Sequence, residues 1–413
     1  MATAGRDRKV RGKNSVSPEL QKLLAPARLG PLELRNRVIK TATFEGMTPQ
    51  GAPTPQLIDF HTRMIDGGVA LTTVGQCNVS PDARNLDNEM YLHPGIKSEL
   101  RALTDAVHAH GGKISAQLTH CGYFKLNKPL ETKRTIAPSF IFNKLGAPYG
   151  RPFTYPMTQR DIDRTIDDYA RSTVLAREAG FDAVEIMACH GYLLNQFLSG
   201  NTNKRTDRYG GSLENRLRFP LEVIAKTRAA VGREFPILVK MNLDDACRGG
   251  LTIDDAVLIG QAFEAAGVDA LVTTAGRSPG NTSFIFRGGS PIPFMVERLK
   301  NPFMKLSLTL FGRLQFPPMP YEELYLLSMA RQLRKAVKCP IVYLGGVSSV
   351  AALETVMREG FDFVAMGRAL IFDPQMINRV RTDANYRNGC THCNICTALI
   401  YDPNGVHCVL TGR

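Results

Sequence analysis

The sequence predicts a (β/α)8 barrel, the TIM-barrel architecture, in a single folded domain. Eight short apolar or β-branched runs lie at broad intervals along the 413 residues, and helical patterns separate them. The runs are mostly continuously apolar rather than alternating, which is typical of parallel strands covered on both faces. Eight strand–helix units in series are the number that closes such a barrel.

The expected strands follow one another with helices between them. The clearest helical patterns cover residues 161–179, 213–231 and 253–266, and the last is followed by Gly267, a helix-stop signal. The phrases Glu-Ala-Gly-Phe-Asp at 178–182 and Arg-Glu-Gly-Phe-Asp at 358–362 indicate a common turn into the fourth and eighth strands, with glycine as helix cap. The eight strands are expected at 38–43, 69–75, 113–118, 183–187, 237–241, 270–274, 341–345 and 361–366.

Three regions are expected along the chain. Residues 1–20 form a basic, disordered tail, residues 21–385 the barrel, and residues 386–413 a cysteine-rich extension. Long loops follow the third and sixth strands, and loops of such length are usually functional or mobile. The loop at 284–316 mixes Phe, Met and Leu with Arg and Lys, which favours a substrate lid or a contact within a homo-oligomer; weak contact with a membrane surface is a third alternative.

Composition narrows the class of protein. With 44% hydrophobic and 22% charged residues, the chain can bury a large core. The net charge of +13 is compatible with phosphorylated ligands, but no basic stretch with interleaved aromatics predicts nucleic-acid binding. No apolar run predicts a transmembrane segment or a secretory signal. Nine cysteines, an odd number with four near the C-terminus, argue against a disulfide framework and favour the cytoplasm.

Glycines at the ends of the last two strands predict a phosphate site. Gly345 and Gly346 end the seventh strand, and Gly367 and Arg368 end the eighth. Glycine lets the backbone approach a phosphate closely, and arginine supplies a forked cationic donor. Barrels frequently bind phosphate in the loops after these two strands.

The segment after the fourth strand carries a longer pattern. Gly-Tyr-Leu-Leu-Asn-Gln-Phe-Leu at 191–198 is followed by Asn-Lys-Arg-Thr-Asp-Arg-Tyr-Gly-Gly-Ser-Leu-Glu-Asn-Arg at 203–216. Together with Leu-Arg-Asn-Arg at 34–37 and Gln-Leu-x-His-x-Gly at 117–122, these phrases closely resemble the old yellow enzyme, or NADH:flavin oxidoreductase, family. The resemblance covers about residues 25–410 and extends to the barrel domain of 2,4-dienoyl-CoA reductase.

The resemblance implies non-covalently bound FMN, reduced by NADH or NADPH. Lys240, which ends the fifth strand, would lie near N1 and O2 of the flavin, where negative charge develops on reduction. Gly75 and Gln117 would hydrogen-bond the polar edge of the flavin. The backbone at the end of the first strand would touch the ring, and the glycine loops would hold the phosphate: Thr41, Ala42 and Thr43, then Gly345, Gly346, Gly367 and Arg368.

The same resemblance assigns a catalytic residue. Tyr192 corresponds to the family's proton donor, which protonates the α-carbon of an enone-like substrate while flavin N5 delivers hydride to the β-carbon. A phenol suits this role because its pKa near 10 keeps it protonated at neutral pH. Two further polar side chains hold the substrate carbonyl in the family. The second maps to His190, whereas the first maps to Met187, which cannot donate a hydrogen bond. Phe44 also departs from the residues that tune the flavin in relatives.

Four cysteines near the C-terminus have the spacing of a metal site. Cys390, Cys393, Cys396 and Cys408 read C-x2-C-x2-C-x11-C, which brings thiolates round one centre. Relatives resembling 2,4-dienoyl-CoA reductase carry a [4Fe–4S] cluster there, although the gap before their third cysteine is three residues rather than two and a further flavin domain follows. A [4Fe–4S] cluster, zinc and no metal stay open as alternatives for these cysteines.

The leading interpretation is an FMN-dependent ene-reductase acting on a small unsaturated carbonyl compound. The alternatives are a dehydrogenase subunit that passes electrons through FMN and a cluster to a partner, and a flavin-binding scaffold whose catalytic pair has decayed. Met187 and Phe44 motivate the scaffold alternative.

Overall fold

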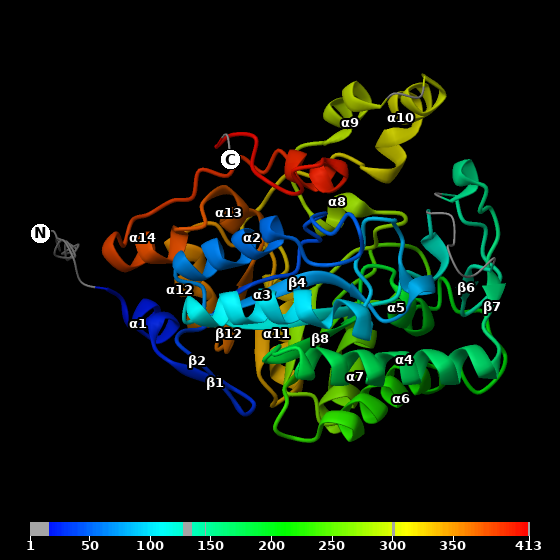
Figure 1. Ribbon diagram of the computed structural model, residues 1–413, viewed down its shortest axis with the longest axis horizontal. Helices are drawn as coiled ribbons and strands as arrows, with labels where there is room; N and C mark the ends of the chain where they lie inside the picture. The colour runs from blue at the N-terminus through cyan, green and yellow to red at the C-terminus, as the bar shows by residue number, and fades with distance from the viewer. Residues whose placement is uncertain (1–15, 127–133, 145, 300–301, 412–413) are drawn as a thin grey trace, which may run out of the picture.

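The computed structural model describes residues 16–126, 134–144, 146–299 and 302–411. Its centre is a closed barrel of eight parallel strands in the order β3-β4-β5-β8-β9-β10-β11-β12, with β12 pairing back onto β3. This confirms the predicted (β/α)8 architecture (Figure 1). The strands are β3 Val38–Lys40, β4 Leu71–Asn78, β5 Lys113–Thr119, β8 Ala183–Ala188, β9 Ile237–Asn242, β10 Ala270–Thr274, β11 Ile341–Tyr343 and β12 Phe363–Met366.

Strand positions were predicted well and strand ends less well. β3 stops at Lys40, so residues 41–43 lie beyond the ladder, and β11 and β12 are shorter than predicted. β4 instead continues past Gly75 to Asn78, through an irregularity in register between Val74 and Cys77. An apolar run marks burial, whereas a strand ends where its hydrogen bonds to the neighbouring strands end.

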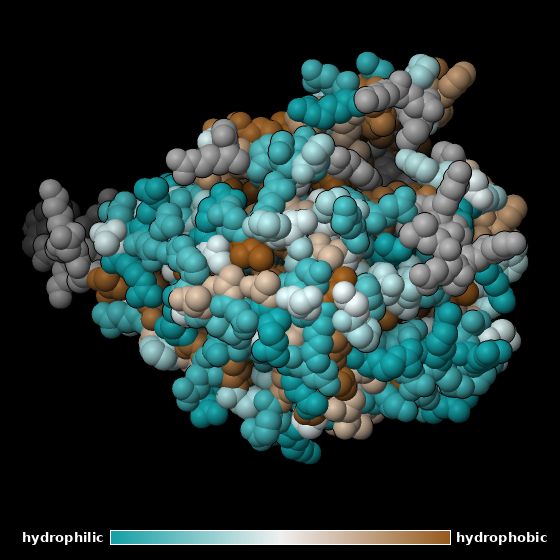
Figure 2. Space-filling view, viewed as in Figure 1, coloured by the Kyte–Doolittle hydropathy of each residue, from teal (hydrophilic) through white to brown (hydrophobic). Residues whose placement is uncertain are grey.

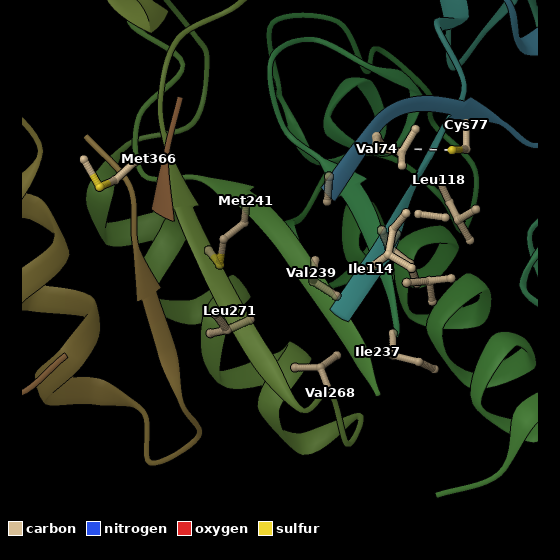
Figure 3. Close-up of a cluster of buried hydrophobic side chains, with 14 of the residues drawn as sticks. Val74, Cys77, Ile114, Leu118, Ile237, Val239, Met241, Val268, Leu271 and Met366 are labelled. Atoms are coloured by element: carbon tan, nitrogen blue, oxygen red, sulfur yellow. Dashed lines mark hydrogen bonds between the residues drawn. The ribbon is translucent and has the colours of Figure 1, made fainter. Parts of the chain in front are cut away.

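Helices cover the outside of the barrel. Helix α4 (Gln159–Glu178) begins with a capping box, because Thr158 accepts from the Asp161 amide and the Asp161 carboxylate accepts from the Thr158 amide. The barrel strands and these helices bury one large apolar core, of which Figure 3 shows a part around Ile114, Val239 and Leu271. The other covering helices are α2 Pro55–Asp66, α3 Lys97–Ala109, α6 Leu213–Val231, α7 Ile253–Ala265, α11 Leu327–Ala336, α12 Val350–Arg358 and α14 Met376–Thr382.

A short helix and hairpin close the N-terminal end of the barrel. Helix α1 (Pro18–Leu24) precedes the antiparallel pair β1 (Ala27–Leu29) and β2 (Leu32–Leu34), whose buried leucines pack against the first residues of the barrel strands. The predicted tail at 1–20 is therefore too long, since α1 begins at Pro18 with Ser17 as its N-cap. The rest of that predicted tail, residues 1–15, lies outside the described residues.

The two long connections both leave the C-terminal ends of strands, and so both rise at the mouth of the barrel. The first holds η3 (Gly122–Phe124), β6 (Ile136–Ala137), η4 (Ala147–Tyr149) and β7 (Tyr155–Pro156). The second holds α8 (Thr282–Ile285), α9 (Ile292–Arg298) and α10 (Pro302–Gln315), and α9 and α10 project from the body of the molecule (Figure 1). Helix α10 exposes Leu306, Leu310, Phe311 and Leu314. Brown side chains lie among teal ones on this projection in Figure 2. Whether it acts as a lid, a subunit contact or a membrane contact stays a prediction.

The C-terminal extension folds back over the mouth. After α14 it contains the 3-10 helix η5 (Ile395–Tyr401). The Val406 amide donates to the Glu45 carbonyl at 2.8 Å, and a Cβ on Gly46 would lie only 2.6 Å from the Ile400 carbonyl oxygen. The extension thus covers the segment that follows the first barrel strand. None of the described helices combines the length and the apolar character that crossing a bilayer requires.

Candidate functional site

A buried lysine spans the centre of the barrel mouth. Lys240 lies in β9, two residues before its end, and β9 stands opposite β3 in the barrel. Its Nζ donates to Thr41 Oγ1 at 2.8 Å. Glu185 on β8 lies 3.9 Å from the same Nζ and accepts from Gln117 Nε2 at 2.6 Å. The predicted residues Thr41, Gln117 and Lys240 therefore come together, joined by Glu185, which the sequence analysis missed.

A second buried ion pair lies beside this centre. Lys40, the last residue of β3, places Nζ 2.5 Å from Glu45 Oε1, and both side chains are buried. The other Glu45 oxygen accepts from the Gly75 amide at 3.2 Å. Burial alone would raise the pKa of Glu45, but Lys40 holds it below its ordinary value. The pair therefore ties the end of β3 to the bend in β4, and the sequence analysis missed it.

Two predicted glycines lie where residues 41–44 approach them closely. A Cβ on Gly75 would lie 2.9 Å from the Phe44 amide nitrogen and 3.0 Å from Ala42 Cβ. A Cβ on Gly367 would lie 3.3 Å from Thr41 Cγ2. Little or no room is left for side chains at these positions. The predicted roles of Gly75 at the polar edge of the flavin and of Gly367 at the phosphate stay predictions.

Tyr192 lies in a small apolar cluster beside the mouth. Its side chain is 5% exposed and packs edge-on against Phe124, with ring centroids 4.9 Å apart. The predicted residue Met187 belongs to the same buried cluster. Gln76 Nε2 donates to the phenol oxygen, which leaves the phenol proton free to be donated. Burial, with the charge of Glu89 second, raises the pKa of Tyr192 well above 10, so the group is protonated at neutral pH.

His190 is neutral and held in a strained conformation. Its φ is +55°, a region that side chains other than glycine rarely adopt and that clusters at functional sites. The backbone amide donates to Asn242 Oδ1 at 3.2 Å, and ring Nε2 lies 2.7 Å from Thr274 Oγ1. Burial first and the charge of Lys240 second lower the pKa of His190 well below its ordinary value. The imidazole can therefore donate only one hydrogen bond.

The hydrogen-bond donors that follow Gly345 and Gly346 in the chain already bind a carboxylate, that of Glu323. Glu323 accepts from the Ser348 amide at 3.1 Å and from both serine hydroxyls at 348 and 349, at the start of α12. These donors therefore suit an anion. Arg368 Nη1 donates instead to the Arg287 carbonyl at 2.8 Å and to Asn394. Cβ atoms on Gly345 and Gly346 would lie within 3.0 Å of residues 322–326. The phosphate assignment stays a prediction.

The four C-terminal cysteines line one small hollow. It has a volume of about 20 Å³ and is also lined by Arg368 and His392. Burial raises the pKa of Cys396 to about 12, and the neighbouring thiols contribute to that rise. Among the residues that the structure describes, no three His, Cys, Asp or Glu side chains are grouped so as to hold a metal ion as they stand. The hollow thus brings Cys390, Cys393, Cys396 and Cys408 together without closing them round a single ion.

The residues at the mouth fit FMN. A fixed cation at Lys240, an amide at Gln117 and a hydroxyl at Thr41 supply donors for the polar edge of an isoalloxazine. The glycines at 75 and 367 keep the rim free of side chains. Gln76 Oε1 is buried and has no hydrogen-bond partner among the described residues, as expected of an atom that faces a bound group.

Comparisons with known proteins agree with this geometry. The profile of the NADH:flavin oxidoreductase / NADH oxidase family matches residues 22–279. The chain is 40% identical over 390 residues to 4,4'-dithiodibutanoate disulfide reductase of Rhodococcus erythropolis, covering 94% of each chain. It is 33% identical over 399 residues to a metal reductase of Desulforamulus reducens, covering 95% of this chain but 53% of that protein. The chain thus spans nearly all of the first relative and about half of the second.

Solved structures show the same fold. Morphinone reductase superposes with a TM-score of 0.67 at 24% identity, covering 89% of this chain and 90% of that one. A 2-naphthoyl-CoA reductase superposes with a TM-score of 0.78 at 23% identity, covering 94% of this chain and 56% of that one.

Proposed function

Because this chain belongs to the NADH:flavin oxidoreductase / NADH oxidase family and is an FMN-dependent NAD(P)H oxidoreductase, we propose that it reduces an activated carbon–carbon double bond. The substrate class is an enone or an enoyl compound. When bound, FMN supplies a hydride from N5, taken from the nicotinamide donor. The protein's own part is to hold the reactants and to donate the proton.

The buried phenol of Tyr192 is the observation that carries the proposal. Reduction of an activated alkene adds a hydride at one carbon and requires a proton at the other. Tyr192 keeps its proton at neutral pH, and its oxygen is positioned by Gln76. Its apolar surroundings disfavour water beside the phenol, which supports the phenol as the proton source.

His190 would hold the oxygen of the activating group. As a neutral imidazole it can donate one hydrogen bond, and Thr274 engages the nitrogen that would not face the substrate. Met187 adds apolar contact but no donor. Loss of one hydrogen-bond donor at a developing oxyanion lowers the reaction rate by on the order of 10²–10³. The absence of a donor at Met187 therefore favours substrates whose alkene is already strongly polarised.

Disulfide reduction is a second candidate, favoured by the relative that is 40% identical over nearly the whole chain and is named a disulfide reductase. Two electrons break the S–S bond and leave two thiolates, and each takes up one proton to give a thiol. Tyr192 can supply the first of these protons. A disulfide has no carbonyl to bind, so Met187 in place of a donor is no handicap for this substrate.

An anaerobic experiment separates the two candidates. The yellow protein is reduced with NADH or NADPH in the absence of oxygen, and its reoxidation is followed with enones, enoyl thioesters and 4,4'-dithiodibutanoate. We expect rapid bleaching by a nicotinamide and rapid reoxidation by an alkene. Reoxidation by the disulfide alone would replace the first candidate with the second. A colourless protein that does not take up FMN would overturn both.

We further propose that the four C-terminal cysteines bind a [4Fe–4S] cluster. The four cysteines line one hollow beside Arg368, and this arrangement supports a group of total negative charge there. Protein purified anaerobically is expected to contain about four iron and four sulfide per chain, as the cluster formula requires, and Cys396→Ser is expected to lose most of both. Zinc in place of iron, or no metal at all, would contradict this assignment.

A further inference from the structure

Arg277 is a buried cation that has no ion-pair partner among the residues the structure describes. It follows β10 at the mouth and is 5% exposed. Nη1 donates to Asn201 Oδ1 at 2.6 Å and to Cys247 Sγ at 3.4 Å, while Nη2 donates to Tyr123 Oη at 3.2 Å. Nε is buried and has no partner within the described part of the chain. A guanidinium removed from water is normally compensated by an anion, because neutral acceptors do not balance its charge.

Asp245, the carboxylate that acts on the pKa of Arg277, forms its hydrogen bonds with other residues. Burial lowers the pKa of Arg277, whereas Tyr123 first, then Cys247 and Asp245, raise it, and the pKa lies above its ordinary value as a result. No ion pair between Asp245 and Arg277 is present among the described residues. One Asp245 oxygen accepts from Asn195 at 3.1 Å and from Asn242 at 2.8 Å, and the other accepts from the Leu251 amide at 3.0 Å. Asp245 therefore holds the loop after β9 rather than neutralising Arg277.

Arg277 lies directly beside the catalytic segment. Its backbone pairs with that of His190, and a Cβ on Gly191 would lie 3.5 Å from Arg277 Nε. Tyr123, which accepts from the guanidinium, packs edge-on against Phe124 at 5.8 Å, and Phe124 packs in turn against Tyr192. Two successive edge-to-face ring contacts therefore connect the guanidinium of Arg277 to the phenol of Tyr192.

We propose that Arg277 and Tyr123 form a carboxylate-binding subsite, and that the substrate is an acid. A planar guanidinium matches a carboxylate with two parallel hydrogen bonds, and the Tyr123 hydroxyl, which accepts from Arg277, has its proton left to donate. This inference rests on the proposed function and narrows it to unsaturated or disulfide-containing acids. The subsite sets specificity, since it holds a part of the substrate away from the reacting bond.

Binding of non-reducible ligands tests the subsite without turnover. The FMN-loaded protein is titrated with acetate, 3-phenylpropanoate and 3-phenylpropanamide, and changes in the flavin absorbance spectrum give each Kd. We expect the acid to bind about 10- to 100-fold more tightly than the amide of the same shape, as charge-assisted hydrogen bonds provide. No binding of either carboxylate, or equal affinity for acid and amide, would overturn the proposal.

Variants assign the preference to Arg277. Arg277→Gln is expected to abolish the preference for the acid while leaving the amide's Kd unchanged, and Arg277→Lys to retain part of it. FMN content and circular dichroism check that both variants fold. Arg298→Gln, a control on α9 at the same end of the barrel, is expected to keep the preference. A preference for the acid that survives in Arg277→Gln would overturn the proposal. A preference that is absent from the wild type and appears only in Cys247→Ala would overturn it as well.

Failure of this inference is distinguishable from failure of the proposed function. If only the subsite is wrong, uncharged enones are still reduced and acids gain nothing in KM over matched amides. If only the reaction is wrong, the spectral titration still shows the acid preference while no alkene reoxidises the protein.

Discussion

Tyr192→Phe is expected to slow reoxidation of the reduced protein by an alkene by about 10²- to 10⁴-fold, the range that a positioned general acid contributes. The ring stays in place, because its contacts with Phe124 and the apolar cluster do not involve the hydroxyl. Reduction by NAD(P)H needs no proton from this group and is expected to be unchanged. Stopped-flow absorbance of each half-reaction measures the two effects separately.

Tyr169→Phe is the matched control. Tyr169 is fully buried on α4, and its hydroxyl has no hydrogen-bond partner among the described residues. Removing that hydroxyl is expected to leave both half-reactions at the wild-type rate. Equal reoxidation rates in Tyr192→Phe and Tyr169→Phe would show that the proton comes from elsewhere, such as water admitted to the mouth.

The barrel could be predicted from the sequence because its signal is local. Strands buried on both faces are apolar throughout. Eight such strands separated by amphipathic helices are compatible with few folds other than a (β/α)8 barrel. The ends of the strands could not be predicted in the same way. Residues 41–43 are as apolar or β-branched as the strand before them, yet they leave the ladder to contact Lys240 and Glu45.

The site was predicted where a family pattern marks it and missed where it depends on long-range contacts. Thr41, Gln117 and Lys240 could be placed because the family resemblance assigns them at or near the carboxyl ends of the first, third and fifth strands. Glu185 was missed because its role appears only when β5, β8 and β9 lie side by side. Gln76 was missed because the bend in β4 that turns it toward Tyr192 has no sequence signature.

Arg277 could have been found from the sequence. It follows the sixth predicted strand by three residues, at the end of the barrel where working residues lie. The rule that located the phosphate loops applies equally to this strand. What the sequence does not contain is that Arg277 is buried and has no carboxylate partner in the described part of the chain, which distinguishes it from a solvated arginine in a loop.

Lys240→Met is expected to slow reduction by NAD(P)H by about 10²- to 10³-fold, the cost of removing one preorganised group at a site of developing charge. Lys240 is buried, so its charge acts through little water and its loss is poorly compensated. The substitution also leaves Glu185 with Gln117 but without the nearby cation. The remaining carboxylate would then oppose negative charge on the flavin.

Two measurements and two further variants identify charge as the cause. The midpoint potential of bound FMN is expected to fall in Lys240→Met, because a reduced flavin that carries negative charge loses its stabilising cation. Lys240→Arg keeps the charge and is expected to recover most of the rate and potential, whereas Lys226→Met, at an exposed lysine on α6, is expected to change neither. If Lys240→Met keeps the wild-type midpoint potential of FMN but is reduced slowly, Lys240 positions Thr41 and Glu185 rather than stabilising charge. A change in geometry alone alters the approach of the nicotinamide but does not alter the equilibrium of flavin reduction.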